Sequence, residues 1–145
     1  MGVPGRAAQV SVAASEETRR YSAFIKFLQA MKYDELAEAI AAAGFDGVEA
    51  TVRTKDGYIK PADAAVELPK FKQALEKQGL DIVILTTDIL KADQEHAESV
   101  LGAAADIGVP RYRLGFWRYD LKKPLPGQLE ELRPEVAKLA GLLGS

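Results

Sequence analysis

Two charged residues interrupt short apolar runs and are the first candidates for chemistry in this chain. Lys26 lies within the run Phe24–Leu28, and Glu49 lies within the run Gly47–Val52. A carboxylate in an apolar strand is costly to bury unless a partner charge accompanies it. Neighbouring parallel strands lie about 4.8 Å apart, so the two side chains could meet on one face of a sheet. We therefore predict a Lys26–Glu49 ion pair, which either supports a substrate site or only holds the interior of the sheet together.

A basic stretch interleaved with aromatic residues is the second candidate. Such a composition can serve nucleic acid, through phosphate contacts and base stacking. The chain as a whole has 19 basic and 21 acidic residues and a net charge of −2, so a nucleic-acid partner would depend on this patch alone. The stretch comprises Arg111, Tyr112, Arg113, Phe116, Trp117, Arg118, Tyr119, Lys122 and Lys123.

The single histidine, His96, does not make a metal site by itself. A site built from protein ligands needs three or four converging donors, and His96 has only Glu95 and Glu98 close by in the sequence. The pattern predicts that His96 lies early in a helix, on its solvated side. The chain has no cysteine, which excludes disulfides, thiolate metal sites and cysteine nucleophiles.

Four successive strand–helix units position these candidates. Gly44, Gly79 and Gly108 each end a helical pattern just ahead of an apolar run, which indicates an internal repeat. Strands that alternate with helices need right-handed crossovers, and therefore form a parallel sheet covered by helices. The predicted strands are 24–28, 47–52, 81–87 and 111–117; the predicted helices are 34–43, 68–78, a third from about 93, and 129–143, the last kinked at Pro134.

Length decides between the possible architectures. A complete (βα)8 barrel takes about 250 residues, whereas this chain of 145 residues holds four units. No G-x-G-x-x-G turn follows a predicted strand, which disfavours a dinucleotide-binding sheet. We predict an α/β fold in which residues 21–145 are the N-terminal (βα)4 half of a TIM barrel, truncated before the fifth strand. Residues 1–20 are predicted to be a flexible tail, and no apolar stretch is long enough to cross a membrane.

The sequence around these units also resembles a known family. The resemblance is carried by Phe24–Leu28, by Tyr33–Ile40 and by the junction Gly44–Thr51, and it continues through Thr86–Asp88 and Arg111–Asp120. In these segments the chain is similar to the first half of the sugar phosphate isomerase/epimerase family, with its xylose isomerase-like TIM barrel. The resemblance implies a metal-dependent isomerase or epimerase that acts on a sugar or a sugar phosphate.

The resemblance also implies where the chemistry lies. In that family Mn²⁺, Mg²⁺ or Co²⁺ is held by two Glu, one Asp and one His of the second half, and two of the carboxylates transfer a proton. The metal ligands and catalytic residues are therefore expected beyond Ser145, and this chain alone is expected to be inactive and to bind no metal tightly. The residues of this chain that could bind or support the substrate, on or near the ends of the strands, are Lys26, Glu49, Thr86, Asp88, Trp117 and Tyr119.

Two of these groups have a purely structural alternative. Thr86 to Asp88 could bind a sugar hydroxyl, or Asp88 could cap the turn that follows the strand. Trp117 and Tyr119 could stack on a sugar ring at the barrel mouth, or pack between strand and helix. Phe116 and Trp117 should point in opposite directions if the strand continues through them.

Other functions stay open at this stage. One is a non-catalytic half-barrel that associates with itself or with a missing C-terminal half. Another is a nuclease of the AP endonuclease type, which needs a histidine-rich trinuclear metal site, and a single histidine argues against it. The reading frame beyond Ser145 would discriminate: Glu, Asp, His and Glu at later strand ends favour the isomerase, several His the nuclease, and a stop codon the half-barrel. The sequence leaves the location open between the cytoplasm and, if residues 1–20 are the remainder of an export signal, the periplasm.

Overall fold

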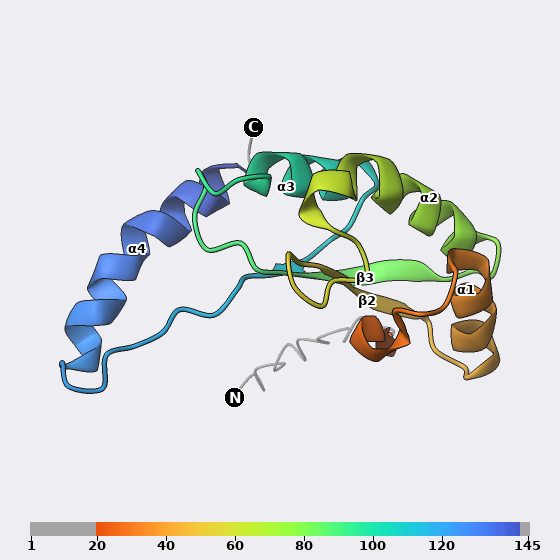
Figure 1. Cartoon of the computed structure of the whole chain (residues 1–145), viewed down its shortest axis with the longest axis horizontal. Helices are drawn as coiled ribbons and strands as arrows, with labels where there is room; N and C mark the ends of the chain where they lie inside the picture. Colours follow the sequence, from red (N-terminus) through yellow and green to blue (C-terminus); the bar gives the residue numbers. More distant parts are fainter. Residues whose placement is uncertain (1–19, 143–145) are drawn as a thin grey trace, which may run out of the picture.

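The computed structural model describes residues 20–142, which form an open parallel sheet with helices between the strands (Figure 1). The strands lie in sequence order, and each pairs in parallel with the next. This confirms the predicted α/β fold, and the open sheet fits half of a barrel. The elements are β1 (Ser22–Phe24), η1 (Ile25–Leu28), α1 (Tyr33–Ala42), β2 (Gly47–Val52), η2 (Pro61–Asp63), α2 (Ala64–Glu76), β3 (Asp81–Thr87), α3 (Ala97–Asp106), β4 (Tyr112–Arg113) and α4 (Leu125–Gly141).

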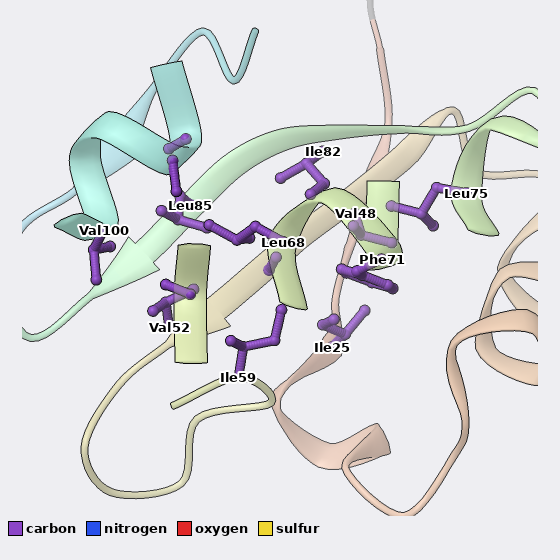
Figure 2. Packing of buried hydrophobic residues seen from close by; sticks show 14 of the residues in the cluster. Ile25, Val48, Val52, Ile59, Leu68, Phe71, Leu75, Ile82, Leu85 and Val100 are labelled. Carbon is purple, nitrogen blue, oxygen red and sulfur yellow. The ribbon is translucent and has the colours of Figure 1, made fainter. Parts of the chain in front are cut away.

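The core lies between the sheet and the helices that follow β1, β2 and β3. Figure 2 shows side chains of β2 and β3 meeting those of α2. Each of these buried side chains contributes about 1.5–3 kcal/mol relative to an exposed one. They include Val48, Val52, Ile82, Leu85, Leu68, Phe71 and Leu75, all at most 1% exposed. Because successive strand residues alternate between faces, Glu49 and Thr51 fall on the opposite, helix-free face of β2.

The three glycines end their helices in the same way. Gly44, Gly79 and Gly108 adopt left-handed backbone angles, with φ of 80°, 71° and 73°. In each case the next residue donates its backbone N–H to the carbonyl five residues earlier, as in Phe45 to Ile40. Glycine adopts this conformation without steric cost, so it suits the end of a helix. The predicted repeat of helix stops is confirmed.

The first predicted strand is wrong. The ladder of β1 ends at Phe24, which pairs with Glu49, and residues 25–28 form the short helix η1 instead. The Gln29 side chain donates hydrogen bonds to the carbonyls of Lys26 and Asp56, which fixes this turn. An apolar run of five residues is compatible with either a strand or a helical turn, and here a contact distant in sequence selects the turn.

Several other boundaries differ from the prediction. The helix expected from residue 68 begins at Ala64, after a turn that starts with Pro61, and this places Pro69 inside α2. The third helix begins at Ala97 rather than near residue 93. The fourth strand is only Tyr112–Arg113, because the chain leaves the sheet there, and α4 begins at Leu125.

The predicted N-terminal tail lies outside the described residues, apart from Arg20. Its guanidinium pairs with Asp81 at 3.7 Å, and it also donates to the Asp46 carbonyl. In the described part of the chain, no helix combines the length and hydropathy that a bilayer crossing requires.

Candidate functional site

Glu49 contacts Thr86 of β3 and Arg113 of β4 rather than Lys26. Its Oε1 accepts a hydrogen bond from the Thr86 hydroxyl at 2.5 Å, and it lies 3.2 Å from Nη2 of Arg113. The Nζ of Lys26 lies instead 3.9 Å from Oδ2 of Asp56. The predicted Lys26–Glu49 pair is wrong because the chain turns into η1 after Phe24, which takes Lys26 out of the sheet.

These contacts form one cluster across all four strands. The guanidinium carbon of Arg113 lies 5.7 Å from the centre of the Phe24 ring, which is a cation–π contact. Phe24, Glu49, Thr86 and Arg113 therefore form a connected group from β1 to β4 on the helix-free face, which we call the strand-end cluster. Glu49 is the third residue of β2, and the other three lie at or next to the carboxyl ends of their strands. The Glu49 side chain is 19% exposed and that of Arg113 is 49% exposed. The carboxylate is thus largely shielded while the guanidinium remains accessible to a ligand.

Arg53 adds a second guanidinium at the carboxyl end of β2. Ile59 donates to the Thr51 carbonyl and accepts from the Arg53 backbone N–H, so the chain stays extended through Arg53. The alternation then places Arg53 on the same face as Glu49 and Thr51. Its Nε is buried and has no hydrogen-bond partner in the described part of the chain, and Arg53 is the one arginine there that is not exposed. A buried donor of this kind usually has a partner, such as a water or an ion.

Asp88 has a structural role different from the one expected. Its Oδ2 accepts the backbone N–H of Thr54 at 2.8 Å, so it joins the end of β3 to the loop after β2. The turn after β3 is instead stabilised by Thr87, whose Oγ1 accepts from Ile89, and by Gln94, whose Oε1 accepts from Leu90. Of the predicted group, Thr86 alone hydrogen-bonds to Glu49.

A cavity of about 330 Å³ lies between the loops that follow β2 and β3. Thr54, Lys60, Asp88 and His96 contribute to its lining. His96 precedes α3, with a left-handed φ of 66°, and is exposed as predicted, though it does not lie inside the helix. Its nearest carboxylate oxygen belongs to Glu95, at 3.6 Å.

Trp117 and Tyr119 lie beside α4 and not in the strand-end cluster. With residues of α4 they line a groove of about 560 Å³. β4 ends at Arg113, so the segment that follows carries both rings away from the other three strands. This position agrees with the alternative in which the two rings pack against a helix, and stacking on a sugar ring stays a prediction. Phe116 is 73% exposed; β4 ends before it, so the alternation expected of a continuing strand does not apply to Phe116 and Trp117.

The divalent metal implied by the resemblance finds no donor set in the described residues. Between residues 20 and 142 no three His, Asp or Glu side chains come together as metal ligands.

The large pKa shifts belong to an aromatic cluster of the core. Burial raises the pKa of Tyr58 to about 12, with a contribution from Glu35, and burial also raises that of Tyr33. The Tyr58 hydroxyl donates to the Met31 carbonyl, and that of Tyr33 donates to Glu67. Both rings also pack on Phe71. These tyrosines remain protonated donors at neutral pH and stabilise the fold.

Comparison with protein-family models found no match, and comparison with curated proteins found none either. The family resemblance therefore stays a hypothesis based on the residues quoted for it. Sequence analysis missed Arg113 as the partner of Glu49 and counted it only in the basic stretch. Its position within the fourth predicted strand, 111–117, where it alternates with Tyr112, is the pattern that could have indicated it.

Proposed function

We propose that this chain is the substrate-supporting first half of a sugar or sugar phosphate isomerase/epimerase. The observation that supports the proposal is the strand-end cluster. In a barrel, the carboxyl ends of the strands line the site. The carboxylate of Glu49, the hydroxyl of Thr86 and the guanidinium of Arg113 offer the acceptors and donors that a polyhydroxylated ligand needs.

The roles of these residues follow from their existing contacts. Glu49 is held in one orientation by Thr86 and Arg113, and a carboxylate can accept further hydrogen bonds from sugar hydroxyls. Arg113 is half exposed and has donors left for sugar or phosphate oxygens. The resemblance assigns the metal and the proton-transferring carboxylates to strands that this chain does not contain. This chain would bind and orient the substrate.

A titration followed by NMR tests the proposal. D-fructose and D-fructose 6-phosphate are added separately to the ¹⁵N-labelled chain, and we expect the shifted amides to be those around Glu49, Thr86 and Arg113. Arg113→Met should weaken binding about tenfold, equivalent to about 1.4 kcal/mol. Arg118→Met is the matched control, because Arg118 is exposed and lies outside the cluster. Shifts confined to other residues, or equal binding by both variants, would contradict the proposal.

A second candidate is a non-catalytic module that associates through its open sheet. β1 and β4 are each paired on one side only, so two strand edges are left without a neighbouring strand in the described residues. Association with a second copy or with a separate C-terminal half would cover these edges. Two results together would favour this candidate over the first. No amide signal would shift on addition of either sugar, and the chain would self-associate unless Tyr112 in β4 is changed to Pro.

A further inference from the structure

The groove beside α4 is an apolar surface that the chain does not fill. It lies between α4 and the segment 114–124, and in Figure 1 this segment runs below the helix at the left. We call it the α4 groove. Leu129 and Val136 in its wall are 43% and 42% exposed. The residues that line it are Trp117, Tyr119, Leu129, Leu132, Arg133, Val136, Ala137 and Ala140.

The sequence of α4 shows that this face is built to be covered. Its apolar residues Leu125, Leu129, Leu132, Val136 and Leu139 are spaced four and three apart, which puts them on one side of the helix. Leu139 alone is buried within α4. The rest of the stripe faces the groove or solvent, so the apolar pattern extends well beyond what the chain itself covers.

The segment that forms one wall of the groove also carries the side chains that could fill it. Phe116 is 73% exposed and Leu121 is 96% exposed. Six of the ten large hydrophobic side chains exposed in residues 20–142 lie between 116 and 136. Such a concentration of apolar surface is typical of an interaction site and is uncommon as scatter on a monomer.

The segment and α4 carry opposite net charges, and the charge of Arg133, which lines the groove, is offset by Glu130 at 3.1 Å. The segment carries Arg118, Lys122 and Lys123 against one acid, Asp120. α4 carries an excess of acid, with Glu130, Glu131 and Glu135 against Arg133 and Lys138. A partner that inserts apolar side chains flanked by basic residues would thus suit the groove, and this chain displays such a segment itself.

We infer that a second copy of this chain occupies the α4 groove. Leu121 inserts between Leu129 and Val136 of the other copy, and the basic residues near Leu121 approach the acidic residues of that copy's α4. Each copy has both surfaces, and in the closed dimer that we infer the contact occurs twice, around a twofold axis. The inference does not depend on sugar binding, and it involves a surface distinct from the open edges of the sheet.

Light scattering on the full chain over a range of concentrations tests this interface. We expect a dimer for the wild type, and dimerisation at least tenfold weaker for Leu121→Asp and for Val136→Asp. Both positions are exposed, so the variants should fold, which circular dichroism checks. Phe27→Asp is the matched control, because Phe27 is 79% exposed but lies in η1, and this variant should dimerise like the wild type.

Mixing the two variants sharpens the test. A pair formed from Leu121→Asp and Val136→Asp keeps one intact contact, whereas a pair formed from either variant alone keeps none. The mixture should therefore associate more strongly than each variant separately. A monomeric wild type at the highest concentration, an undiminished Leu121→Asp dimer, or a dimer that only Tyr112→Pro in β4 disrupts would each overturn the inference; the last would assign association to the sheet edge.

Discussion

The first three strand–helix units and the fourth differ in how much each helix buries. α2 and α3, of 13 and 10 residues, each bury five side chains, whereas α4 buries one of its 17 residues. All three sequences carry an apolar stripe. The difference arises because β3 is seven residues long and β4 only two, so α4 has little sheet to pack on. An apolar stripe thus specifies that a helix needs a partner, and the neighbouring strands determine whether the chain supplies it.

Polar contacts follow the same division. The first three units have local ion pairs within α2, and they also have pairs that join separate elements, as Lys77 joins Asp34 at 2.8 Å and Lys72 joins Asp81 at 2.5 Å. The ion pairs of α4 are local, with spacings of three residues along the helix. The Glu49–Arg113 pair is the exception, since it ties β4 to β2.

Core truncation should show the largest difference between the two regions. Leu68→Ala removes a fully buried side chain of α2 and should cost about 2–5 kcal/mol. Leu132→Ala removes a partly exposed side chain of α4, and we expect a loss of about 1 kcal/mol or less. Urea unfolding of the monomer, followed by circular dichroism, measures both. Equal losses would show that α4 is packed as tightly as α2.

The contact between the two regions should give the next largest effect. Glu49→Gln removes the charge that Arg113 and Thr86 share, and we expect a loss of about 2 kcal/mol, since hydrogen bonds to charged groups contribute about 1.5–3 kcal/mol. Asp56→Asn is the control, because it breaks the exposed pair with Lys26 and should cost about 0–1 kcal/mol. Urea unfolding measures both variants. An unchanged free energy of unfolding for Glu49→Gln would show that the strand-end cluster does not stabilise the fold.

A pH titration probes the first three strand–helix units alone. The folded pKa of Tyr58, about 12, lies above its ordinary value of 10.0, so its contribution to stability is complete below pH 10 and is lost as the pH rises towards 12. Tyr58→Phe should reduce this loss and should cost about 1 kcal/mol at pH 7, because the bond to Met31 disappears. Unfolding measured from pH 7 to 11 gives both quantities. Superimposable pH profiles would refute the assignment.

We expect the addition of a divalent metal ion to have the smallest effect on the chain. Calorimetric titration of the chain with Mn²⁺ should give no stoichiometric site of micromolar affinity, and Mn²⁺ should not raise the unfolding midpoint. A site of micromolar affinity would contradict this prediction and would show that the chain holds metal ligands itself. Repeating the titration on Asp88→Asn and His96→Ala would then locate them.

Local patterns were sufficient for part of the fold. The third strand, residues 81–87, was predicted with its observed bounds because a long β-branched run has few alternatives. The glycine helix stops were predictable because left-handed backbone angles favour one residue type. The first run, 24–28, failed because its conformation depends on Gln29 and Asp56, whose contact no local pattern contains.

The candidate site was predictable only in part, for a related reason. Glu49 and Thr86 could be placed on strands, and Glu49 needed a partner charge. The identity of the partner depends on how the strands are aligned. Because β1 ends at Phe24, Lys26 lies outside the sheet, and Glu49 pairs with Arg113, two strands away. Pairing across strands is a property of the assembled sheet, so residue type alone suggested Lys26 as the partner and missed Arg113.

The order of the strands in the sheet has a consequence for how the protein is made. The sheet runs β1, β2, β3, β4, which is also the order in which a ribosome releases them. Each unit can therefore dock on a neighbour that is already present, and no strand has to wait for a distant one, as it would in a sheet with interleaved order. The Glu49–Arg113 contact spans three units and forms only when the last strand arrives. Nascent chains that end before Arg113 should consequently hold a folded core while β4 and α4 are still to come.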